Sequence, residues 1–69
     1  MKVLVFPSDN FDLTVISEMT DEQKLDLAYS SYSDGVVWYD NERDFQEAFN
    51  NGYISDQTFI FFVESADSL

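Results

Sequence analysis

The chain has 69 residues, with 14 acidic and 3 basic side chains, a formal net charge of -11, and neither His nor Cys. Without Cys there are no disulfides, zinc knuckles or thiol nucleophiles, and without His the commonest general base and metal ligand are missing. The three cations, Lys2, Lys24 and Arg43, do not suffice to neutralise a phosphate backbone, so we expect no direct binding to nucleic acid.

Hydrophobic residues make up 45% of the chain and aromatic residues 17%, unlike a disordered acidic chain. We therefore expect a single folded domain over residues 1–69, with 65–69 as a frayed tail. No apolar run approaches the roughly 20 residues of a membrane helix, and the run before Pro7 is too short for a signal peptide. These features predict a cytoplasmic protein that makes no contact with membranes.

The first half of the chain predicts a strand, a segment that is either a second strand or an extended loop, and a helix. Residues 2–6 are β-branched and aromatic, which is typical of a strand that Pro7 ends. Residues 11–16 alternate between apolar and polar over the first five positions, as in a half-buried strand, although an extended loop tucked under the sheet is the alternative. Thr20 and Gln23 form a capping-box pattern, which predicts a helix over 21–30.

The second half predicts a strand, a helix and a strand. Residues 36–39 are apolar throughout, as in a strand buried on both faces, and 58–63 are apolar on both faces, as in a central strand. Between them, Asp40 or Asn41 caps a helix over 41–50, with a core-facing stripe of Phe45, Ala48 and Phe49.

This order predicts an α/β fold with two helices and a small sheet of three or four strands, in which parallel connections are right-handed. If the strand order follows the chain order, both helices cover one face and the other face is left apolar and exposed. Two solutions are open. The helices cover opposite faces, which requires the first strand in the centre, or two copies pack through a sheet face or an edge strand in a homodimer. We favour the dimer, because two short helices do not easily cover both faces.

No pattern in the sequence predicts catalysis. Residues 40–44 place oxygen ligands at alternate positions, as in an EF-hand loop, but Phe45 stands where that loop needs Gly and Asn51 where it needs Glu. We interpret this segment as a helix N-terminus. No Ser lies in a nucleophile-elbow motif, and no Gly-rich phosphate loop is present. We expect no enzyme activity, no metal and no cofactor.

The aromatic residues suggest a surface for protein partners, because such residues are enriched at interface hot spots. The candidate interface residues are Tyr32, Trp38, Phe59 and Phe61, with Trp38 favoured as a core residue. Our first hypothesis is a small acidic, non-enzymatic interaction module whose partner is a protein, a second copy included.

The alternative hypothesis is a nucleic-acid mimic that inhibits a DNA-binding protein by presenting carboxylates in place of phosphates. Mimicry needs carboxylates in a row. Glu22 and Asp26 are four residues apart on the predicted first helix, and Glu18 continues the row just before it.

Residues 45–55, together with the run Phe-Ile-Phe-Phe-Val that ends at Val63, resemble short uncharacterised acidic proteins of gut Bacteroidetes. The resemblance covers the C-terminal half and contains no diagnostic motif. It implies an intracellular protein of unknown function and transfers no site residues.

The net charge of -11 predicts that salt stabilises the protein. Like charges repel one another more strongly in the compact state, and salt screens this repulsion. We expect the melting temperature to rise from low to moderate salt, as measured by circular dichroism. A melting temperature that stays constant over this range contradicts the prediction.

Overall fold

The sheet has three strands, and the first strand of the chain lies in its middle. The computed structural model describes residues 1–64, in which three strands alternate with helices. In chain order the elements are β1 (Lys2–Pro7), α1 (Leu13–Ser17), α2 (Asp21–Ser30), the 3₁₀ turn η1 (Tyr32–Asp34), β2 (Val37–Tyr39), α3 (Glu42–Asn50) and β3 (Thr58–Val63). The spatial order is β2-β1-β3, and both neighbours run antiparallel to β1. The predicted α/β class and element order are confirmed, whereas the expected parallel connections between neighbouring strands are absent from the described sheet.

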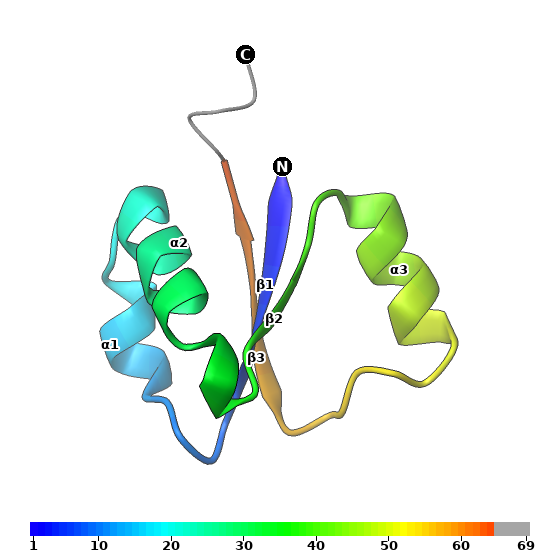
Figure 1. Ribbon diagram of the computed structural model, residues 1–69, viewed down its shortest axis with the longest axis horizontal. Helices are drawn as coiled ribbons and strands as arrows, with labels where there is room; N and C mark the ends of the chain where they lie inside the picture. Colours follow the sequence, from blue (N-terminus) through cyan, green and yellow to red (C-terminus); the bar gives the residue numbers. More distant parts are fainter. Residues whose placement is uncertain (65–69) are drawn as a thin grey trace.

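The helices cover opposite faces of the sheet, with α1 and α2 on one side and α3 on the other (Figure 1). Successive side chains of a strand point to opposite faces. Leu4 and Phe6 of β1 accordingly pack into the cluster beneath α2, whereas Val3 and Val5 join Phe45 of α3 on the other face. The first of the two arrangements left open by the sequence is therefore the observed one, and no sheet face is left bare for a partner.

The strand predicted to be central, 58–63, is an edge strand. β1 takes the centre because four consecutive residues, 3–6, are buried and so need cover on both faces and a partner on both sides. β2 forms the other edge. Its first residue, Val37, is 45% exposed, so the expectation that 36–39 is buried on both faces is wrong.

The optional strand over 11–16 is instead the short helix α1. The Oδ1 atom of Asp12 accepts hydrogen bonds from the N–H groups of Thr14 and Val15, at 2.9 and 3.4 Å, and so caps the first turn. Only Ile16 of this helix is buried. A strand here has no side of β1 left to pair with, because β2 and β3 already occupy both.

The helix predicted over 21–30 is confirmed together with its capping box. The Thr20 hydroxyl accepts from the Gln23 N–H at 3.1 Å, and the Gln23 side chain accepts from the Thr20 N–H at 2.9 Å. The helix buries Leu25 and Ala28 against the sheet. This cap fixes where α2 begins, and so where its first residue meets the end of β3.

In α3 the cap is Asn41, whose Oδ1 accepts from the Asp44 N–H at 2.8 Å. Of the predicted stripe, Phe45 is buried, Ala48 is half-buried, and Phe49 is 51% exposed although its ring packs against Phe45. Gly52 has the left-handed φ of +79° that ends the helix. Phe45 is thus the one residue that α3 buries against the sheet.

Replacing Thr20 with Ala removes one half of the capping box. We expect a loss of about 1 kcal/mol in the free energy of unfolding, the usual cost of a lost N-cap. Thr20→Ser keeps the hydroxyl and serves as the control, with a loss well below that of Thr20→Ala. Urea unfolding curves of the three proteins measure the difference, and equal losses for Ala and Ser contradict the prediction.

Candidate functional site

The part of the chain that the structure describes contains no cluster of side chains suited to hold a metal ion. Within residues 1–64 no three acidic side chains converge as metal ligands. A hollow of about 350 Å³ lies between the beginning of β3 and the β1–β2 pair, where Tyr53, Ser55 and Thr58 contribute hydroxyl groups and Asp9 the one carboxylate. None of the helices in the described part reaches the length and apolar character needed to cross a membrane.

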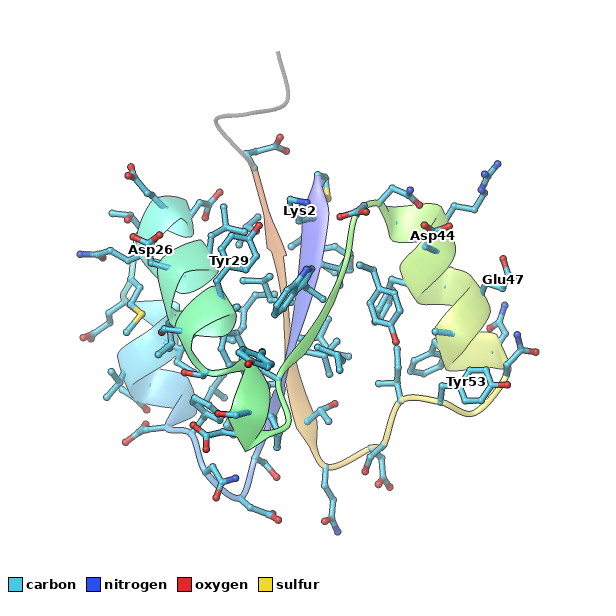
Figure 2. The ribbon with its side chains drawn as sticks, viewed as in Figure 1. Lys2, Asp26, Tyr29, Asp44, Glu47 and Tyr53 are labelled. Carbon is cyan, nitrogen blue, oxygen red and sulfur yellow. The ribbon has the colours of Figure 1, made fainter. Side chains whose placement is uncertain are left out.

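The four candidate interface residues do not form one surface. Tyr32 lies in η1 and is 69% exposed. Trp38, Phe59 and Phe61 pack half-buried against the cluster beneath α2. The Trp38 ring meets the ring of Tyr29 edge-on, with 4.9 Å between centroids, as expected for a core residue. Figure 2 shows Tyr29 on the side of α2 that faces the sheet.

Several acidic side chains lie on the outer sides of α2 and α3. Glu22 and Asp26 are exposed on α2, one helical turn apart. Glu18 is exposed too, but it ends α1 and does not belong to the helix that carries the other two. In Figure 2, Asp26 and Glu47 point away from the sheet on opposite sides of the molecule. Part of the negative charge therefore flanks the sheet on its two helical sides, and Asp56 and Glu64 lie beyond the two ends of β3.

The outer edge of β3 carries backbone N–H and C=O groups at alternate residues. The Ser8 N–H donates to the Gln57 C=O at 3.1 Å, which continues the β1–β3 register by one pair. In an antiparallel pair, residues that exchange hydrogen bonds alternate with residues that do not. The odd-numbered residues of β3 therefore turn their backbone groups toward β1. The outward row consists of Thr58, Ile60 and Phe62.

Asp21 closes this row at its far end. The N–H of Glu64, the next outward residue, donates to the Oδ2 of Asp21 at 2.9 Å. Asp21 is the first residue of α2, and Lys24 one turn later lies 4.0 Å from its other carboxylate oxygen. The Lys24 ammonium also lies 5.0 Å from the centroid of the Phe61 ring. The beginning of α2 is thereby joined to the end of β3, and three residues of the row stay open.

Phe62 is the interface candidate that the sequence analysis missed. Its side chain points to the α3 face, is 49% exposed, and meets the Phe45 ring edge-on at 5.9 Å. In Figure 1 the helices flank the sheet, which is seen on edge, so they cover its faces and leave its outer edges uncovered. The sequence signal was the run 58–63, which contains no charge, Pro or Gly in a chain that is 25% charged. Natural edge strands usually carry a charged residue or a Pro, which hinders pairing with another chain.

Comparisons of the chain with models of protein families, with curated proteins and with solved structures found no match. Among the described residues, the open edge of β3 is the feature best suited to bind a partner.

An ion pair joins the beginning of β1 to the end of β2 and yields a prediction for pH. The Lys2 ammonium donates to the Oδ1 of Asp40 at 2.8 Å, and this hydrogen bond and the positive charge hold the pKa of Asp40 below its usual range. Since the folded state favours the carboxylate form, the pair stabilises the fold at neutral pH. This contribution disappears as the pH falls through the lowered pKa.

We expect Lys2→Met to raise the pKa of Asp40 toward the usual value, as measured by NMR titration of the carboxyl carbon. Lys24→Met removes an equal charge on α2 and is the control, in which the Asp40 pKa stays low. An Asp40 pKa that Lys2→Met leaves unchanged contradicts the assignment.

Proposed function

We propose that this protein is a small acidic interaction module that self-associates through the edge of β3. Two copies place their β3 strands side by side and antiparallel, which joins two three-stranded sheets into one continuous sheet. The observation that carries the proposal is the outward row of Thr58, Ile60 and Phe62, which offers free backbone groups from a strand without a charged residue.

The two edges of the sheet differ in what they offer a partner. β2 spans three residues, of which only Trp38 turns its backbone groups outward, since Val37 and Tyr39 lie on the same alternation as their β1 partners. β3 spans six residues and adds the half-exposed ring of Phe62. A long, apolar, uncharged edge is the kind that pairs with another strand. The edge of β3 is therefore the better contact surface.

The net charge of -11 acts against association, and its placement limits that effect. Acidic side chains on the outer sides of α2 and α3 point away from the sheet, as Asp26 and Glu47 do in Figure 2. Two copies joined edge to edge keep these charged sides in water. At physiological salt the Debye length is about 8 Å, so repulsion between the distant acidic sides is largely screened.

Mimicry of a nucleic acid is the second candidate, and the exposed pair Glu22 and Asp26 on α2 is the observation in its favour. A mimic releases its target as salt rises, and DNA competes for that target. Self-association through β3 has the opposite salt dependence, because salt screens the repulsion between copies. The two candidates therefore differ in whether added salt weakens or strengthens the association.

We expect Phe62→Lys to abolish self-association, because a Lys on an edge strand disfavours pairing with another strand. Phe49→Lys is the matched control. Phe49 and Phe62 are 51% and 49% exposed, and their ring centroids lie 6.0 and 5.9 Å from that of Phe45. Both variants change the net charge equally, and only Phe62 lies on the edge.

Sedimentation equilibrium at two salt concentrations measures the effect. The expected result is a dimer for the wild-type chain and for Phe49→Lys, more stable at the higher salt, and a monomer for Phe62→Lys. A wild-type chain that is monomeric under all conditions overturns the proposal, as does equal weakening by both substitutions.

A further inference from the structure

We infer that the two-fold axis of the β3 pair passes through Ile60. Thr58 of one copy then faces Phe62 of the other, and Ile60 faces its own equivalent. This inference rests on the proposed self-association and specifies its register.

Hydrogen-bond alternation restricts the registers that two identical β3 strands can adopt. Residues that exchange hydrogen bonds across the new pair must both belong to the outward row, which contains only even-numbered residues. A two-fold axis midway between two residues pairs an outward residue with an inward one and is excluded. Axes that pass through a residue remain, and those nearest the middle of the strand pass through Phe59, Ile60 or Phe61 and allow the longest pairing.

Of these three, only the axis through Ile60 uses the whole open row. It pairs Thr58 with Phe62 and Ile60 with Ile60, so the three N–H and three C=O groups of each copy all find partners. The axis through Phe61 places Thr58 opposite Glu64, whose N–H already donates to Asp21 at 2.9 Å.

The axis through Phe59 fails at the other end of the strand. It places Phe62 opposite Asp56, which lies before the first residue of β3. Asp21 and the beginning of β3 thus limit the row at its two ends, and Ile60 is the midpoint between them.

The side chains fit this register on both faces of the sheet. On the side of α2, Phe59 faces Phe61 of the other copy, an aromatic pair across the strands. On the side of α3, the half-exposed ring of Phe62 gains Thr58 as its neighbour. Beyond the strand, Asp56 faces Glu64 at each end, and this like-charge contact is one that salt screens.

Two single-cysteine variants test the register, since the chain has no Cys of its own. With the axis at Ile60, the Cα atoms of the two copies of residue 60 lie about 5.5 Å apart, within the range that a disulfide bridges. The two copies of residue 61 are then diagonal neighbours at about 7–8 Å, beyond that range. We expect Ile60→Cys to form cross-linked dimer at least about tenfold faster than Phe61→Cys under mild oxidation, as read from non-reducing gels.

The opposite preference overturns the register while leaving self-association intact, and so does a dimer that neither variant cross-links. Amide hydrogen exchange on the wild-type chain is the second measurement and needs no variant to fold. The amides of Thr58, Ile60 and Phe62 should gain protection as concentration rises, whereas those of Phe59 and Phe61 are protected throughout. Unchanged exchange at all three outward amides in the dimer overturns the inference. A monomer at every concentration and salt overturns the proposed function as well.

Discussion

The structure depends on one constraint, the complete burial of β1. The four consecutive residues 3–6 are all buried. Each face of the strand therefore needs to be covered, and each side needs a hydrogen-bonded neighbour. Both helical layers and both edge strands follow from this requirement. The same requirement determines which surfaces of the described sheet stay open. Both faces are covered by helices, and only the outer edges of β2 and β3 lack a neighbouring strand.

The sequence correctly predicted those elements whose formation depends on residues close together in the chain. The capping box of Thr20 and Gln23 placed α2 at its observed bounds, and the aromatic run 58–63 placed β3. Strand order stayed open and the prediction that 58–63 is central was wrong, because order depends on which strand gains most from two neighbours, a competition between segments far apart in the chain. The segment 11–16 failed for the same reason, because its alternation predicts a strand only if a side of β1 is free. The part of the prediction that concerns 65–69 lies outside the described residues.

The candidate surface was only partly accessible to sequence reasoning. The aromatic residues Phe59 and Phe61 lie in the strand with the open edge, but their rings pack beneath α2. The edge presents mainly backbone N–H and C=O groups to a partner. Whether these groups point outward depends on the position of a residue in the hydrogen-bond alternation of the sheet and not on its side chain. Phe62 was missed because an apolar residue on a strand assumed to be central is expected to be buried.

The position of β1 in the middle of the sheet has a consequence for synthesis. The ribosome releases β1 first, yet its longest pairing is with β3, where Lys2 meets Val63 more than 50 positions later. The topology therefore has a high contact order, and the sheet is completed only after nearly the whole described chain has emerged. Until then the most buried strand of the molecule lacks its main partner, and the acidic segments that follow it help to keep the unfinished chain in solution.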